Sequence, residues 1–280
     1  MIIFTHHTGE PHGILGAQVA ATFLQQKVSI PSIVVGIERN FSKEGLLRFI
    51  DEYYAGKEKV AAFSHLCGRK DLIGLVQELK QNGFITLLGG PQVRQDYYGE
   101  PDTDLYPNRF RGLKSIVDIA FHGPVNGLRL EHLGMEKGLL EYPWAKNIFL
   151  EVDWTNIYTF SDTLKKLDVR LGQVLNAIGC PYAIKPQTAL LPPPINLRGK
   201  DIPEIEVQSE GCIFCDVSRD KGYHGSIERD KVISQIAGLP EIDGRKIPFE
   251  LIDEYPIRSL AKLLEETEGH EIKLSQINLV

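Results

Sequence analysis

Short, continuous apolar runs alternate with stretches of helical periodicity over the first part of this chain. The apolar runs fit buried strands, and the periodic stretches between them fit helices. Apolar strands that alternate with helices are typical of a parallel sheet covered on both faces. We therefore predict an α/β fold that begins with a doubly wound parallel domain over residues 1–127. Its expected strands are Ile2–Thr5, Pro31–Ile37, Val60–Ser64, Gly83–Leu88 and Val117–Phe121, and its expected helices are His12–Gln25, Ser42–Ala55 and Arg69–Gln81.

The pattern changes after residue 127. Residues 128–203 are predicted to form a helical and proline-rich connector, with a helix over Ser161–Ile178 and a stiff segment over Pro186–Pro203. Strand and helix signals return over residues 204–280, beginning with a strand at Glu204–Gln208. A complete (β/α) barrel takes roughly 200 residues or more. Residues 204–280 could hold only its first units, so we expect the chain to be part of a longer protein.

The composition excludes several classes of function. A net charge of −6 argues against broad binding of nucleic acid, which needs a basic face. No apolar run reaches the roughly 20 residues that span a bilayer, so we expect no membrane partner. Four cysteines are too few for a disulfide scaffold at this length, and we expect a cytoplasmic protein.

Small and polar residues follow several of the expected strands, where a parallel sheet binds its ligands. A glycine-containing segment with His12 follows the first strand, Ser64 and Leu66 end the third, and Gly89 and Gly90 follow the fourth. Gly123 follows the fifth strand. Glycines at strand ends let a large planar ligand approach the backbone, because no Cβ intrudes.

These residues resemble the motifs of cobalamin-binding domains, which carry D-x-H-x-x-G, S-x-L and G-G after the corresponding strands of a Rossmann-type fold. Ser64-x-Leu66 and Gly89-Gly90 stand in the family's order, and Glu10-x-His12 is a degenerate form of the first element. The resemblance implies that Ser64 and the glycines hold the nucleotide tail of cobalamin, and that His12 is the lower axial ligand of cobalt. The glutamate at position 10 departs from the family pattern and leaves the role of His12 open.

Two cysteines, Cys212 and Cys215, form a C-x-x-C pair in a turn after the Glu204–Gln208 strand. This segment resembles the first strand and cysteine loop of radical-SAM barrels, whose motif is C-x-x-x-C-x-x-C. The resemblance implies a 4Fe–4S cluster held by three thiolates, S-adenosylmethionine on the open iron, and Phe214 beside the adenine. The motif's first cysteine would fall at position 208, which holds Gln208. Cys180 is the candidate third ligand.

The residues leave other interpretations of the cysteine segment open. Cys180, Cys212, Cys215 and His224 could bind zinc, which accepts this ligand set. A thioredoxin-like dithiol requires the pair at a helix N-terminus, whereas this segment reads as a loop. The cysteines could also be unmodified residues in a buried turn, as we expect for Cys67.

Together the two resemblances imply a cobalamin-associated radical-SAM enzyme, an oxidoreductase or methyltransferase, with residues 204–280 as the N-terminal part of the barrel. Such an enzyme cleaves S-adenosylmethionine reductively and draws electrons from a ferredoxin or flavodoxin. The alternative is a protein that binds a corrinoid or another small ligand, with a structural or zinc-binding cysteine segment. No pattern in the sequence identifies the small-molecule substrate.

Overall fold

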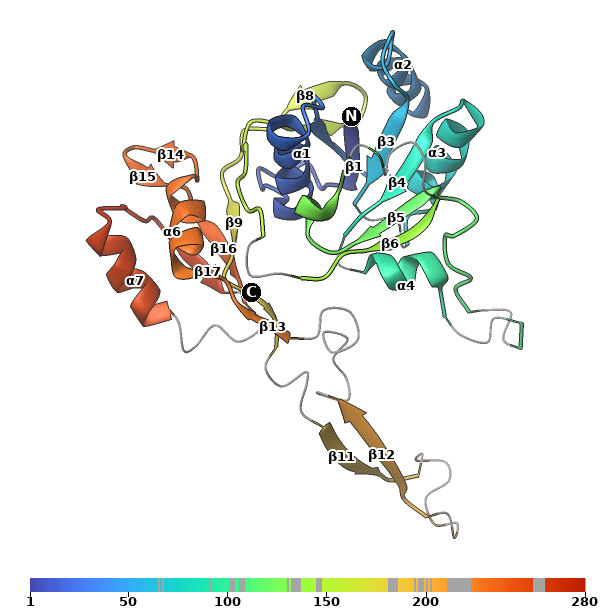
Figure 1. Cartoon of the computed structure of the whole chain (residues 1–280), viewed down its shortest axis with the longest axis vertical. Helices are drawn as coiled ribbons and strands as arrows, with labels where there is room; N and C mark the ends of the chain where they lie inside the picture. Colours follow the sequence, from blue (N-terminus) through green and yellow to red (C-terminus); the bar gives the residue numbers. More distant parts are fainter. Residues whose placement is uncertain are drawn as a thin grey trace.

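The computed structural model describes residues 1–64, 66, 68–90, 92–100, 104–105, 109–129, 131, 137–144, 148–180, 186–193, 195, 199, 201, 203–210, 223–253 and 260–279. Within them, the predicted α/β architecture is confirmed: a mostly parallel eight-stranded sheet forms the centre (Figure 1). Its strand order is β6-β5-β4-β3-β1-β2-β7-β8, and only β8 runs antiparallel to its neighbour. These strands are β1 (Ile2–His6), β2 (Ile33–Ile37), β3 (Val60–Phe63), β4 (Ile85–Leu88), β5 (Ile119–His122), β6 (Gly138–Glu141), β7 (Ile157–Phe160) and β8 (Leu164–Lys166).

Helices cover both faces of this sheet because alternate strand residues are apolar on each side. On one face, α2 (Lys43–Tyr53), α3 (Lys70–Gln81) and α4 (Val93–Tyr98) pack over a core that includes Phe4 and Phe63. On the other face lie α1 (Leu15–Lys27) and the short 3₁₀ helix η1 (Val125–Gly127). The predicted N-cap of α2 is confirmed, since the Ser42 hydroxyl accepts a hydrogen bond from the Gly45 N–H at 3.1 Å.

A second, three-stranded parallel sheet lies beside α1 and shares its core. Its order is β17-β16-β9, built from β9 (Gly172–Leu175), β16 (Phe249–Ile252) and β17 (Ile277–Leu279). Helix α6 (Arg229–Ala237) precedes β16, and α7 (Leu260–Gly269) connects β16 to β17. A small antiparallel ribbon, β14 (Glu241–Ile242) and β15 (Arg245–Lys246), follows α6.

The helix that we predicted over Ser161–Ile178 is wrong. That stretch holds β8, β9 and β10 (Ala177–Gly179), and residues along β9 alternate between buried and half-buried. Gly172 explains part of the error: a Cβ there would lie 2.4 Å from a terminal methyl group of Leu239, so the start of β9 packs closely against the segment after α6. A spacing of three or four between apolar residues fitted a helix, but the contacts of the second sheet decide the strand.

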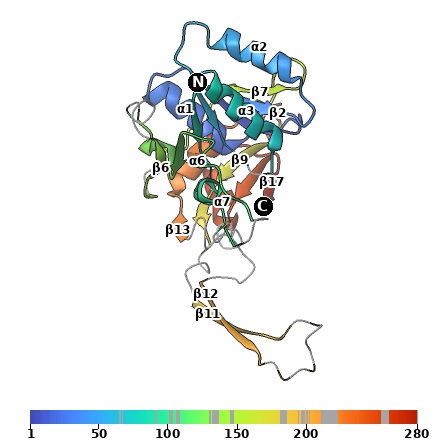
Figure 2. The same cartoon turned by 90° about the vertical axis from the view of Figure 1, so that its right-hand side faces the viewer.

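The proline-rich segment contains a strand that we did not predict. Residues Pro186–Leu191 form β11, which pairs antiparallel with β12 (Ile205–Glu210) in a hairpin that projects away from both sheets (Figures 1 and 2). The strand expected at Glu204–Gln208 therefore exists as β12, but its partner is β11 and not a strand of the parallel sheet. A second antiparallel pair joins β10 to β13 (Tyr223–Ser226).

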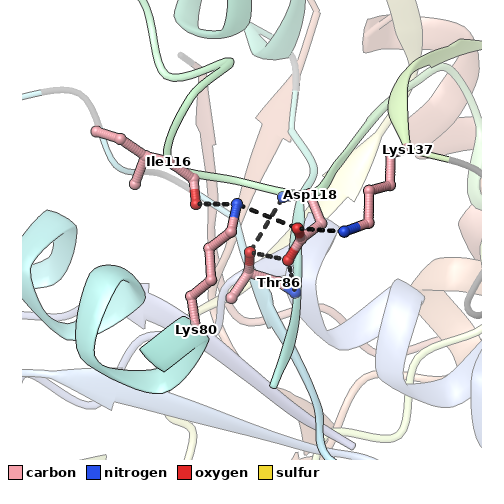
Figure 3. A network of polar contacts seen from close by, with 5 residues as sticks. All are labelled: Lys80, Thr86, Ile116, Asp118 and Lys137. Carbon is pink, nitrogen blue, oxygen red and sulfur yellow. Dashed lines mark hydrogen bonds and ion pairs between the residues drawn. The ribbon is translucent and has the colours of Figure 1, made fainter. Parts of the chain in front are cut away.

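A buried carboxylate ties the amino-terminal edge of the large sheet together (Figure 3). Asp118 accepts hydrogen bonds from the Thr86 N–H at 3.1 Å and the Thr86 hydroxyl at 2.9 Å. Its other oxygen lies 3.1 Å from the Lys80 ammonium and 3.5 Å from that of Lys137. These contacts join β4, α3 and the segments that lead into β5 and β6.

None of the helices in the described parts of the chain is both long and apolar enough to cross a membrane.

Candidate functional site

The strand order identifies one edge of the large sheet as the place for a ligand. The chain leaves β1 toward β2 on one side and later returns to β3 on the other side, so the topological switch point lies between β1 and β3. Ligands of open parallel sheets bind outside the carboxyl ends of the strands at such a point. His6 ends β1 there, and Ser64 directly follows β3.

A buried histidine organises the loop after β1. The His7 side chain is 1% exposed, and its ring stacks on His12 with the centroids 4.4 Å apart. Its Nδ1 accepts a hydrogen bond from the Gly9 N–H at 2.9 Å, and its Nε2 lies 2.9 Å from the His12 carbonyl oxygen. A carbonyl can only accept, so we infer a neutral ring that carries its proton on Nε2. His7 thus fixes the backbone that presents His12.

His7 is expected to make the fold less stable in mild acid. Burial is the largest influence and lowers the pKa of His7, outweighing the hydrogen bond to the His12 carbonyl, which raises it. The unfolded chain binds a proton near pH 6.5, so this contribution is complete above that pH and is lost as the pH falls through the lowered pKa. The free energy of unfolding, measured with urea, should decrease less between pH 7.5 and pH 5.5 in His7→Gln than in the wild type. The exposed His270→Gln variant should keep the wild-type loss, and an identical loss in all three proteins would contradict the assignment.

A chain of polar contacts crosses the switch point itself. The Arg69 guanidinium reaches back from the start of α3 to Nδ1 of His6, at the end of β1. The same guanidinium binds Asp71 through two bonds, Nε to Oδ1 at 2.8 Å and Nη2 to Oδ2 at 2.6 Å. The hydrogen bond from Arg69 is the largest influence on the Asp71 carboxyl and lowers its pKa. The edge therefore holds an oriented arginine between a histidine and a carboxylate.

The residues predicted for cobalamin lie at or near this edge, in different packing environments. Ser64 is half-buried, whereas the Leu66 side chain is fully buried in the core beneath the helices α2 to α4. A Cβ on Gly90 would lie 2.5 Å from the Ser64 carbonyl oxygen, and one on Gly123 would lie 2.2 Å from that of Tyr142. These two glycines permit close packing of neighbouring strand ends. Gly89 differs, since a Cβ there meets nothing within 4 Å.

His12 lies between the two sheets. It forms an isolated β-bridge with Leu171, directly before β9, and its backbone N–H donates to the Glu10 carbonyl at 2.8 Å. The side chain of Gln173 on β9 accepts a hydrogen bond from the Leu15 N–H at 3.0 Å. The loop after β1 is therefore fixed to the start of the second sheet. A ligand on His12 would touch both parts of the molecule.

Cys180 is the candidate cluster ligand that the structure describes, and its thiol is half-buried. It directly follows β10, downstream of the carboxyl end of β9. Cys212, Cys215 and Phe214 lie outside the described residues. In the part of the chain that is described, no three histidine, cysteine or carboxylate side chains are grouped to hold a metal ion.

A buried asparagine holds the turn that leads to Cys180. Asn176 is 2% exposed, its N–H donates to the Ile252 carbonyl at 3.0 Å, and its side-chain amide donates to Asp253 Oδ2 at 2.5 Å. Its own carbonyl accepts from the Ile227 N–H at 2.8 Å, beside the start of α6. Asn176 thereby links the carboxyl ends of β9 and β16 to β13 and α6. These hydrogen bonds fix the direction in which the chain approaches Cys180.

Sequence reasoning missed His6, His7, Arg69 and Asp71. The signal for the histidines was present, because both directly follow or end the first apolar strand and so fall at the edge where parallel sheets bind ligands. The position of Arg69 beside His6 could not be predicted, because it depends on the pairing of β1 with β3.

Comparisons of the chain with family models, with curated proteins and with solved structures found no match.

Proposed function

We propose that the chain is a cobalamin-associated radical-SAM enzyme whose 4Fe–4S cluster is held by Cys180, Cys212 and Cys215. The observation that carries the proposal is the place of Cys180. It directly follows β10, the short strand that comes after β9, and β9 begins a β9–α6–β16–α7–β17 unit in which consecutive parallel strands are neighbours. Neighbouring parallel strands in chain order are the arrangement of (β/α) barrels, whose sites are built beyond the carboxyl ends of the strands.

The β11–β12 hairpin supports Cys180 as the missing first cysteine. Pro186 pairs with Glu210 at the base of the hairpin, so the chain leaves and returns at one place. The hairpin lies between Cys180 and Cys212 and reads as an insertion into a cysteine loop. Residue 208, where an uninterrupted motif would need its first cysteine, is Gln208 in β12, opposite Thr188.

The donor set fits the proposed group. Three thiolates hold a 4Fe–4S cluster and leave one iron open, where bound S-adenosylmethionine would be cleaved to start radical chemistry. Asn176 would fix the approach of the chain to Cys180, and Asp253 would lie at the same end of the neighbouring strand. Phe214 would stack beside the adenine. The electrons would come from a ferredoxin or flavodoxin.

The carboxyl edge of the large sheet is the proposed cobalamin site. Ser64 and Gly89 end adjacent strands there, and His12 lies beside the same edge. Because the Gly89 position opens into free space, the flat face or the tail of a corrinoid could pass over it without moving the backbone.

Gly89→Val should weaken cobalamin binding by about tenfold or more, since steric overlap in a packed site costs about 1–3 kcal/mol. The fold should be unaffected, because the new Cβ meets no atom within 4 Å. Equilibrium titration followed by the corrinoid absorbance would measure the affinity. Gly269→Val is the matched control, also with open space around its Cβ, and should bind like the wild type. Equal affinity in all three proteins would count against this site.

A second candidate function is that of a corrinoid or small-ligand binding protein with a structural or zinc-binding cysteine segment. The observation that favours it is Gln208, because a carboxamide held in β12 replaces the expected thiolate. Anaerobic reconstitution with iron and sulfide separates the two candidates. About four irons per chain, with the brown absorbance of a cluster, support the enzyme. A colourless protein, or one that takes up zinc instead, supports the binder.

A further inference from the structure

We propose that a cavity at the carboxyl ends of the strands of the large sheet binds a small molecule that carries a phosphate or pyrophosphate group. The cavity has a volume of about 720 Å³ and lies on the side of α2 and α3. It is formed by the loop after β2, the first turns of both helices, and the turn between β7 and β8. The charged residues around it are Arg39, Lys43, Lys70, Asp71 and Asp162.

The charges around this cavity favour an anion. Arg39 and Lys70 are exposed, and neither forms an ion pair with any residue that the structure describes. Lys43, the third cation, is held by Glu78 at 2.6 Å. Asp71 is already neutralised by the two bonds from Arg69. Asp162 is the remaining carboxylate, on the exposed turn between β7 and β8. Two cations are thus available to a ligand.

The backbone around the cavity adds to this preference. Both α2 and α3 begin there, and the amino end of a helix carries a partial positive charge. At α2, the Ser42 side chain caps the Gly45 N–H. At α3, the N-cap residue Arg69 makes no capping bond, and the Asp71 carboxylate accepts from the Asp71 and Leu72 N–H groups of the first turn. The two cations and the amino ends of both helices therefore act on the same cavity.

The volume and the wall of the cavity limit the class of ligand. Pockets of about 300–1,000 Å³ hold molecules much larger than an inorganic phosphate ion. Phe41, Leu75 and the bare backbone of Gly74 form an apolar wall beside the cations. A phosphate or pyrophosphate joined to a ring, as in a nucleoside diphosphate, matches both the cations and the apolar wall. The proposal does not depend on iron or cobalamin.

Calorimetric titration with pyrophosphate and with ADP would test the site on the full chain. The double variant R39E/K70E should bind at least about tenfold more weakly, because it replaces the two available cations with carboxylates that repel phosphate. Lys166→Glu, an exposed lysine on β8, is the charge control and should match the wild type. Tighter binding of ADP than of pyrophosphate would support the apolar wall as part of the site.

A steric variant tests the cavity independently of charge. Gly74 lies within α3, and a Cβ there meets nothing within 4 Å, so Gly74→Leu would fill the cavity without strain. It should abolish ADP binding while preserving the fold. Gly16→Leu makes the same exchange at an open position in α1 and should leave binding unchanged. Absence of binding to the wild type at millimolar ligand, or unchanged affinity in R39E/K70E and Gly74→Leu, would overturn the proposal.

Discussion

Cys180→Ala is expected to reduce the iron content of the anaerobically reconstituted protein from about four atoms per chain to nearly none. Three thiolates are the minimum set for a cluster with one open iron, and residue 208 is a glutamine, whose carboxamide is a poor iron ligand beside thiolates. Loss of the Cys180 thiolate would leave only the Cys212 and Cys215 pair. Iron and sulfide quantification, together with an electronic spectrum, would measure the effect.

The controls for this experiment are in the same chain. Cys67→Ala should keep the full iron content, since Cys67 has no assigned ligand role. Circular dichroism of apo Cys180→Ala should match the wild type, because the described hydrogen bonds of the turn come from Asn176 and β10 and not from the thiol. Stoichiometric iron in Cys180→Ala would eliminate it as a ligand. Iron lost equally from Cys67→Ala would indicate a general loss of folding.

Asp118→Ala should lower the free energy of unfolding by about 3 kcal/mol, because hydrogen bonds to a buried charge are worth about 1.5–3 kcal/mol each. Asp118 is 7% exposed, and its removal leaves the Thr86 N–H without its side-chain acceptor. It also removes the carboxylate that lies 3.1 Å from the Lys80 ammonium in the wild type (Figure 3). Asp51→Ala removes an exposed carboxylate on α2 and should change stability by less than about 0.5 kcal/mol. Urea denaturation followed by circular dichroism compares the two variants.

The same carboxylate should make the fold sensitive to strong acid. Burial alone raises the pKa of Asp118, but the hydrogen bonds from Thr86 and Lys80 outweigh it, so the net pKa is lowered. A lowered carboxyl pKa contributes stability above the unfolded value near pH 4, and this contribution is lost as the pH falls through the folded value. Asp118→Ala should therefore lose less stability than the wild type between pH 5 and 3. If the free energy of unfolding changed equally with pH in the two proteins, this account would be contradicted.

Sequence alone determined the parallel sheet and which residues lie at the carboxyl ends of its strands. Continuous apolar strands such as Val60–Phe63 can be satisfied only by burial on both faces, and the periodicity of α2 and α3 marks the helices that cover one of them. The N-cap at Ser42 is equally local, because its hydrogen bond spans three residues. Ser64, Gly89 and Gly90 could be placed at one edge because parallel strands end together.

Tertiary structure decided what depends on partners distant in the sequence. Gly172 and Leu175 belong to a strand only because β16 provides their hydrogen-bonding neighbours, and local spacing cannot encode that contact. The Arg69 contact with His6, the cavity between α2 and α3, and the hairpin inserted before Cys212 likewise arise from pairing across dozens of residues. Hydrophobic periodicity reports which side of an element is buried. Which other element buries it is determined only when the whole chain folds.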